Sequence, residues 1–219
     1  MNSSPKSLWF ALVVVSVLSA CGGDDGIANA TVAAMRASPT GTRARVAGFV
    51  TVPPGRFNSS TDELGFAIQD ASGGIYVTST LVSDLPLGTP VRLQAELQSV
   101  NTQLTLVPIG PVEKLAGSLL IEPQDMATGS VNEGTAGTLV RIGGRLTQPI
   151  QSDLPYGHIA HIDDGSGESK VFVNIVSGHP VIDIAGLTTG VDVQVTGFVF
   201  KYDNVLEVAP RQASDLLRR

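Results

Sequence analysis

The chain has 219 residues, of which 42% are hydrophobic and 16% charged, and its formal net charge is −6. This length allows one large or two small domains, and 24 Gly with 13 Pro suit short strands joined by many turns. The chain has one Cys, three His and no Gly-rich phosphate loop. The composition therefore argues against catalysis, and we expect a protein that is not an enzyme.

The N-terminus predicts a signal peptide over residues 1–20. Lys6 precedes the apolar run 8–15, which is too short to span a bilayer as a stable helix. The run leads into Leu-Ser-Ala-Cys at 18–21, which resembles the lipobox of bacterial lipoproteins. That resemblance implies cleavage before Cys21 and lipidation of its sulfur; the alternative is an ordinary signal peptide with a chance Cys. Because Cys21 is the only cysteine, no disulfide or thiolate metal site remains.

The residues after the predicted cleavage site indicate where the chain is held. Residues 21–30 are predicted to be a short tether to a lipid-anchored position in the bacterial cell envelope. In the lipoproteins that this segment resembles, Asp after the Cys favours the inner membrane. Gly22 stands there instead and favours the outer membrane. Loss of Lys6 leaves 13 basic against 20 acidic residues, a charge of −7, which disfavours a nucleic-acid partner.

The remaining chain contains one unit used twice. The segment T-R-A-R-V-A-G-F-V-T-V-P at 42–53 matches T-L-V-R-I-G-G-R-L-T-Q-P at 138–149. Further matches follow in the same order: 68–73 with 162–167, 75–77 with 171–173, 87–93 with 189–195, and 101–108 with 203–210. Five matching blocks in one order indicate a duplicated domain.

Each repeat has the pattern of a small β-barrel. Residues 91–97 and 193–199 alternate between apolar and polar with period two, which predicts strands. The D-x-S-G sequences at 70–73 and 164–167 are typical of hairpin turns. Gly inside the first strand of each repeat predicts a bulge or a sharp bend. We therefore expect an all-β fold of two tandem five-stranded OB-like barrels.

The motifs R-[VI]-x-G, Q-D-x-S-G-G-I-Y-V and L-x-L-x-P also resemble the bacterial extracytoplasmic OB-fold. Residues 31–36 resemble the short helix that precedes the barrel in that family, so each barrel is expected to follow a short helix or turn. The predicted domains are 31–115 and 137–219. The linker 116–136 is either flexible or packed, and the sequence leaves this open.

Several patterns that resemble active or metal sites have simpler explanations. His158 and His161 lie three apart on a predicted strand and so point to opposite faces, which disfavours a shared metal ion. The acidic run at 163–168 lacks the ligand spacing of a calcium loop and matches a plain turn in the first repeat. No nucleophile elbow is present. We therefore predict no catalytic residue, no metal and no cofactor.

The candidate ligand face lies on strands 2 and 3 of each barrel and on the adjoining loops, where OB-folds bind oligonucleotides or sugars. The predicted ligand residues are Tyr76, His161 and Phe172 on these strands, together with Arg45, Phe49, Arg141 and Arg145, which are expected to point outward from the first strand of each barrel. Aromatic rings with arginines suit stacking and phosphate contact. The alternative is that Tyr76 and Phe172 cover the side of the barrel or contact the other domain. In that case Arg45 and Arg141 are solvated strand residues.

A second aromatic cluster, Phe198, Phe200 and Tyr202, occurs in the second repeat only and is predicted to be an apolar contact patch. A position between the domains is one interpretation of this patch. The sequence thus favours a lipid-anchored, non-catalytic binding or scaffolding protein. Its expected partners are the membrane, through the lipid, and a protein or glycan of the envelope. The alternative is an oligonucleotide-binding lipoprotein that handles nucleic acid outside the cytoplasm.

Overall fold

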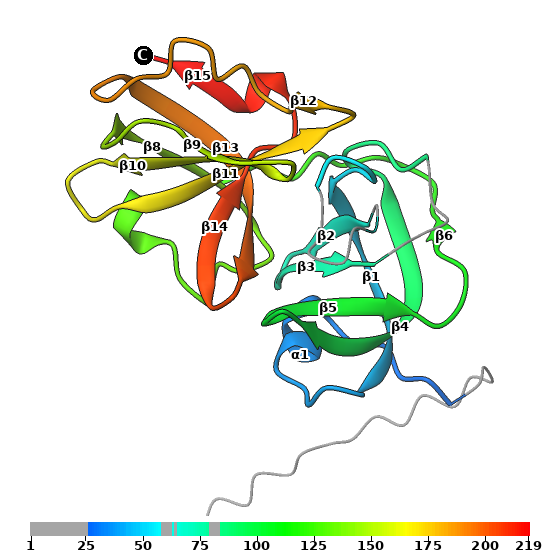
Figure 1. The fold of residues 1–219 in the computed structure, drawn as a ribbon. Coiled ribbons are helices and arrows are strands. Elements are labelled where there is room, and N and C mark those ends of the chain that lie inside the picture. The colour runs from blue at the N-terminus through cyan, green and yellow to red at the C-terminus, as the bar shows by residue number, and fades with distance from the viewer. Residues whose placement is uncertain (1–25, 58–62, 64, 79–83) are drawn as a thin grey trace, which may run out of the picture.

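The computed structural model describes residues 26–57, 63, 65–78 and 84–219, and within them the chain forms two closed barrels (Figure 1). The first barrel consists of β1 (Arg43–Val52), β2 (Phe66–Asp70), β3 (Gly73–Val77), β4 (Pro90–Val100) and β5 (Gln103–Pro108). The second consists of β8 (Leu139–Leu146), β10 (Gly157–Asp163), β11 (Ser169–Val176), β13 (Asp192–Tyr202) and β14 (Val205–Ala209). The prediction of an all-β fold with tandem OB-like barrels is confirmed.

Both barrels have the same strand order. In the first, β1, β2, β3, β5 and β4 are neighbours in that order, and β4 pairs with β1 again. In the second, β8, β10, β11, β14 and β13 repeat the order, and β13 pairs with β8. The pairs β3–β5 and β11–β14 are parallel, while the other pairs within each barrel are antiparallel.

Short strands extend these sheets. They are β6 (Glu113–Lys114) on β4, β7 (Gln124–Asp125) on β8, β9 (Gln151–Asp153) on β10, β12 (His179–Pro180) on β11 and β15 (Leu216–Arg218) on β13. Two 3₁₀ turns, η1 (Thr128–Ser130) and η2 (Ala213–Asp215), complete the second repeat. In the part of the chain that is described, no helix is long and apolar enough to cross a membrane.

The residues that the alternating pattern predicts to point inward form the core of the first barrel. Val91, Leu93, Ala95 and Leu97 of β4 are all buried, because every second residue of a strand points into the barrel. The glycine of the first strand serves a close approach: a Cβ on Gly48 would lie 3.1 Å from the carbonyl oxygen of Gln69 on β2. The bulge in β1 falls later, between Val50 and Val52.

A short helix closes one end of the first barrel. Helix α1 (Val32–Arg36) begins after Thr31, whose hydroxyl accepts a hydrogen bond from the Ala34 N–H. Val32 and Met35 are fully buried in the barrel core. This confirms the helix predicted over 31–36.

The D-x-S-G turns form hydrogen bonds with α1 in the first repeat and with η1 in the second. The sequence did not reveal this role. In the first repeat, the Asp70 carboxylate accepts the Val32 N–H at 2.9 Å, and the Ser72 hydroxyl accepts the next N–H of α1 at 2.9 Å. The second repeat uses the same atoms: Asp164 accepts the Thr128 N–H at 3.3 Å, and Ser166 accepts the Gly129 N–H at 2.9 Å.

Part of the predicted linker belongs to the second barrel. Strand β7 pairs in parallel with β8, and η1 lies in contact with β8 and β10. Ser169 of β11 donates a hydrogen bond to the Thr128 carbonyl at 2.6 Å. The C-terminal part of 116–136 is therefore packed.

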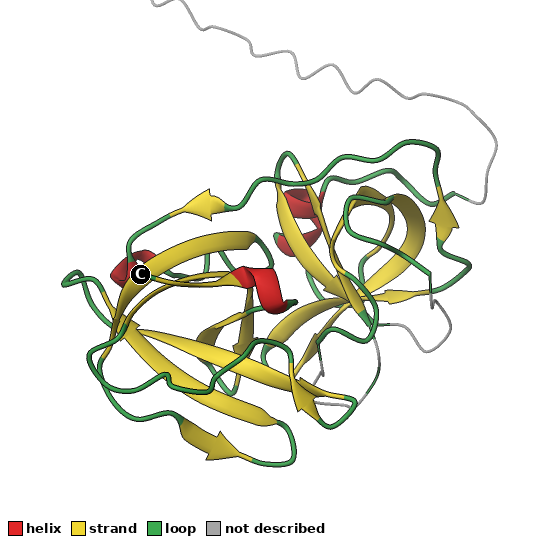
Figure 2. Cartoon of the chain, turned by 90° about the horizontal axis from the view of Figure 1, so that it is seen from above, coloured by secondary structure: helices red, strands yellow, loops and turns green. Residues whose placement is uncertain are grey.

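The two barrels pack through an aromatic cluster, and the views in Figures 1 and 2 show them side by side. Its buried members are Val52, Phe57, Ala67, Tyr76, Phe198, Phe200 and Ala209. Phe57 makes edge-on contacts with Phe200, Tyr76 and Phe198 at ring-centroid distances of 4.7, 5.4 and 5.7 Å. The apolar patch expected from Phe198 and Phe200 is thus confirmed as an interdomain contact, whereas Tyr202 is exposed.

Polar contacts cross the same interface. Arg211 is buried, forms a two-point ion pair with Asp215, and donates to the Thr51 carbonyl of β1 at 2.8 Å. The side-chain oxygen of Gln69 accepts the Leu139 N–H at 3.0 Å. The bonds from Arg211 to Thr51 and from Leu139 to Gln69 join the two barrels and so fix their relative position.

Candidate functional site

A cleft of about 400 Å³ lies where the barrels meet, beside the aromatic interface. It is lined by Phe57, Glu63, Tyr76, Val100, Gln103, Thr105, Asp153, Tyr156, Lys170, Phe172, Phe200, Lys201, Tyr202 and Glu207. The first barrel contributes residues of β3, β4 and β5 and of the segment after β1, and the second contributes β9, β11, β13, β14 and the loop before β10. The cleft therefore includes the third long strand of the second barrel, the loop before its second long strand and the end of its fourth, which border the region where OB-folds take ligands.

The aromatic residues of the cleft form a buried floor and an open rim. Phe57, Tyr76 and Phe200 are buried and belong to the barrel interface. Tyr156, in the loop between β9 and β10, is 58% exposed, and Tyr202, at the end of β13, is 50% exposed. Exposed aromatic rings beside a cleft offer flat apolar surfaces to a ligand.

Both lysines of the cleft are paired with glutamates. Lys170 forms an ion pair with Glu207, its neighbour across the parallel β11–β14 pairing. Lys201 forms one with Glu133 at 2.6 Å. Burial raises the pKa of Glu207 above its ordinary value, and the hydrogen bond and charge of Lys170 oppose that shift. The lining contains two lysines against three carboxylates, so its balance is slightly acidic.

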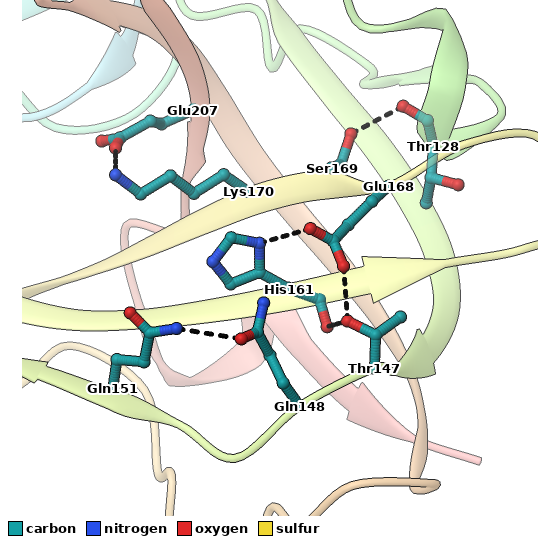
Figure 3. Close-up of polar contacts among 9 residues, drawn as sticks. All are labelled: Thr128, Thr147, Gln148, Gln151, His161, Glu168, Ser169, Lys170 and Glu207. Carbon is teal, nitrogen blue, oxygen red and sulfur yellow. Dashed lines mark hydrogen bonds and ion pairs between the residues drawn. The ribbon is translucent and has the colours of Figure 1, made fainter.

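Next to the cleft, His161 of β10 belongs to a separate polar chain (Figure 3). Its Nδ1 lies 2.7 Å from Oε1 of Glu168, and Oε2 of Glu168 accepts the Thr147 hydroxyl at 2.6 Å. These bonds, that of Thr147 first, lower the pKa of Glu168. His161 is the cross-strand partner of Lys170 but does not line the cleft.

Tyr76 points outward from its barrel as predicted, but the second barrel covers it. Its side chain is 2% exposed and packs against Phe57 and Phe198. The hypothesis that Tyr76 offers an open stacking surface is therefore corrected, because the interface takes up the ring. Phe172 is half-buried and lines the cleft, and its ring packs edge-on against that of Phe200 at a ring-centroid distance of 6.1 Å.

The match between Tyr76 and Phe172 is also corrected. Tyr76 pairs with Thr105 across the parallel closure of the first barrel, and Lys170 pairs with Glu207 across that of the second. Since Thr105 and Glu207 correspond in the repeat, Lys170 is the counterpart of Tyr76. The sequence match shifted this strand by two residues, which preserves the alternation and so left no sign of the error.

The predicted β1 and β8 residues lie away from the cleft. Arg45 is paired in register with Gln94 on β4, and Phe49 lies opposite Gln69 and Pro90. Of the predicted ligand residues, Tyr76 and Phe172 line the cleft, and Arg45 and Phe49 do not.

The two arginines of β8 hold surface carboxylates. Arg141 forms an ion pair with Asp125 at 3.1 Å, and Arg145 forms one with Asp192 at 3.2 Å. Neither lines the cleft. Cys21, the predicted lipidation site, lies outside the described residues.

The sequence analysis missed most of the cleft lining, including the polar and exposed residues Asp153, Tyr156, Lys170, Lys201 and Glu207. Tyr156 carried a usable signal, since it lies in the loop between the first two long strands of its barrel, a recognised ligand position. Across the described part of the chain, no group of three or more His, Cys, Asp or Glu is arranged to hold a metal ion.

Comparison with known proteins gives distant structural likeness only. No family model matches the chain, and no curated protein matches its sequence. A murine DNA-binding protein bound to double-stranded DNA is 11% identical with a TM-score of 0.40, over 80% of this chain and 94% of that one. The Ifi202 HINa domain with double-stranded DNA is 9% identical with a TM-score of 0.38, over 82% and 96%.

A replication protein A heterotrimer bound to single-stranded DNA is also similar. It is 13% identical with a TM-score of 0.34, over 84% of this chain and 50% of that one. These identities and scores are low, and the DNA ligands are properties of those proteins.

Proposed function

We propose that this chain is a non-catalytic binding protein that takes its ligand in the cleft between the barrels. The observation that carries the proposal is the position of Tyr156 and Tyr202. Both are about half exposed and both line the cleft. Tyr156 lies in the loop before the second long strand of its barrel, and Tyr202 is the last residue of β13, directly before the turn to β14. They therefore lie at or next to the two loops that flank an OB ligand face. A buried aromatic floor and paired charges provide a preformed site.

The proposal includes a place in the cell. The apolar run at 8–15, followed by Leu-Ser-Ala-Cys at 18–21, supports a lipid anchor, and Gly22 supports the outer membrane over the inner one. In this proposal the lipid holds the two barrels at the envelope surface. Labelling with a radioactive fatty acid tests the anchor: the full chain is expected to take up label, and Cys21→Ala is expected to take up none. Label retained in Cys21→Ala would contradict it.

A single-tryptophan reporter tests the cleft. The only Trp is Trp9, in the predicted signal peptide, so a chain that begins at Gly22 has none. Tyr156→Trp places one reporter at the cleft rim, and Leu217→Trp places the control at a site 55% exposed on β15. The probes are neutral trisaccharides, oligothymidylate and an unstructured lysine-rich peptide.

We expect a saturable change in emission from Tyr156→Trp with at least one probe and none from Leu217→Trp. The proposal is overturned when no probe gives a saturable change, or when the two reporters respond equally. The probe that responds also separates the ligand classes.

A single-stranded oligonucleotide is the second candidate ligand. Lys170 and Lys201 line the same cleft as the exposed tyrosines, and stacking with basic contacts is how single strands are bound without sequence preference. Binding of oligothymidylate at physiological salt would support this candidate. Binding that vanishes as salt rises from a low value would indicate only non-specific attraction.

A further inference from the structure

From the chemistry of the cleft we infer that its ligand is a short stretch of uncharged saccharide. The inference depends on the proposed function, since it names the ligand class of the same cleft. Three observations carry it: the exposed tyrosines, the paired charges and the acidic balance of the lining.

The tyrosines suit a ring with an apolar face. Tyr156, in the loop before β10, and Tyr202, at the end of β13, are 58% and 50% exposed, and Phe172 lines the same cleft half-buried. A sugar ring has one face made of C–H groups, and placing that face on an aromatic ring removes apolar surface of both from water. Each phenol hydroxyl remains able to donate and accept hydrogen bonds at the rim.

The Lys170–Glu207 pair suits hydroxyl groups. An ammonium group has three N–H donors and a carboxylate has about four acceptor positions, so the pair has capacity beyond its own bond. The pair has no net charge. Lys170, the more exposed member of the pair, can therefore donate to ligand hydroxyls while Glu207 balances its charge. Asp153, which also lines the cleft, supplies an acceptor.

The charge balance disfavours a polyanion. Two lysines face three carboxylates in the lining, and each lysine is already bonded to a glutamate. A phosphate entering the cleft would have to compete with Glu207 for Lys170 and would lie near Asp153. Since affinity for nucleic acids comes mainly from phosphate neutralisation, this lining favours a neutral polyhydroxyl ligand.

Calorimetric titration of the chain beginning at Gly22 tests the ligand class. The probes are cellotriose, chitotriose and maltotriose, with oligothymidylate as the charged comparison. We expect saturable heat with at least one trisaccharide. Tyr156→Ala and Tyr202→Ala are each expected to weaken it about threefold to tenfold, the range typical of one aromatic contact. The control Leu217→Ala, an equally exposed site outside the cleft, is expected to leave it unchanged.

Asp153→Asn separates the two ligand classes. Removing this carboxylate is expected to weaken trisaccharide binding, whereas it would strengthen binding of a phosphate ligand by removing repulsion. Saturable oligothymidylate binding that Tyr156→Ala abolishes, with no trisaccharide heat, would overturn the saccharide inference and leave the proposed cleft function standing. Absence of heat with every probe, together with a silent Tyr156→Trp reporter, would overturn both.

Discussion

The backbone N–H of Asn204 donates to the hydroxyl of Thr102 at 3.0 Å, so corresponding turns of the two repeats touch each other. Each turn is a two-residue hairpin connection with left-handed backbone: φ is 45° and 69° at Asn101 and Thr102, and 46° and 64° at Asp203 and Asn204. These turns join the fourth and fifth strands of their barrels. Their contact places two OB ligand loops beside one cleft.

Arg211 is expected to be the polar residue on which the barrel interface most depends. Arg211→Ala leaves Asp215 buried without its partner and removes the bond to the Thr51 carbonyl, at a cost of about 3–5 kcal/mol in the free energy of unfolding. The exposed pair Arg145–Asp192 is the control, and Arg145→Ala is expected to change the free energy of unfolding far less, because water screens the pair. Urea denaturation measures both, and equal effects would contradict this account.

Gly74 is expected to accept no side chain. A Cβ there would collide with the carbonyl oxygen of Gly137, so the barrels approach each other backbone to backbone at this point. Gly74→Ala is expected to lower the free energy of unfolding by about 1–3 kcal/mol through overpacking. Gly110→Ala is the control, because nothing lies within 4 Å of its Cβ position and its φ is ordinary. A neutral Gly74→Ala would show that the barrels separate freely.

Tyr76 and Tyr156 are expected to have opposite roles. Tyr76→Ala opens a cavity in the aromatic interface and is expected to destabilise the fold by about 3–5 kcal/mol. Tyr156→Ala changes an exposed rim and is expected to shift stability by no more than about 0.5 kcal/mol. Thermal unfolding of the two variants measures the difference. Similar losses would place Tyr156 in the structural core instead.

Asp164 is expected to make the second barrel sensitive to acid. Hydrogen bonds from the Ser166 hydroxyl, then from the Thr128 hydroxyl and from backbone N–H groups, hold the pKa of Asp164 well below its usual 3.8. Because the folded-state pKa is lowered, this contribution to stability is complete above pH about 4 and is lost as the pH falls through the folded-state pKa.

Asp164→Asn is therefore expected to unfold at a lower temperature than the parent chain at neutral pH, with the gap closing in strong acid. Scanning calorimetry across pH measures the gap. Asp125→Asn, which removes a surface ion-pair partner of Arg141, is the control and is expected to show little change. A gap independent of pH would contradict the assigned role of the carboxylate.

The barrels were predictable because their signals are local. Alternation with period two at 91–97, the D-x-S-G turns and the glycine of the first strand each depend on neighbours in sequence. The predicted helix at 31–36 was equally local. The hydrogen bonds that Thr128 donates to the Asp164 carboxylate were not predictable in this way, because they join residues 36 positions apart.

The candidate site was less predictable, because a pattern says which way a side chain points but not what covers it. The alternation of apolar and polar residues correctly predicted that Tyr76 points out of its barrel. Only the position of the second barrel decided that its ring is buried. The counterpart of Tyr76 is Lys170, which the parallel β11–β14 register reveals and the sequence match concealed.

By itself the sequence determined two OB-like barrels, their turns and the outward direction of the aromatic residues, since all of these follow from the spacing of neighbouring residues. Only the tertiary structure decided that the face of the first barrel that carries Tyr76 packs against the second barrel. It also decided that the face of the second barrel that carries Phe172 borders the cleft. The physical reason is that both outcomes depend on contacts between segments more than a hundred residues apart, such as Tyr76 with Phe198 and Thr51 with Arg211.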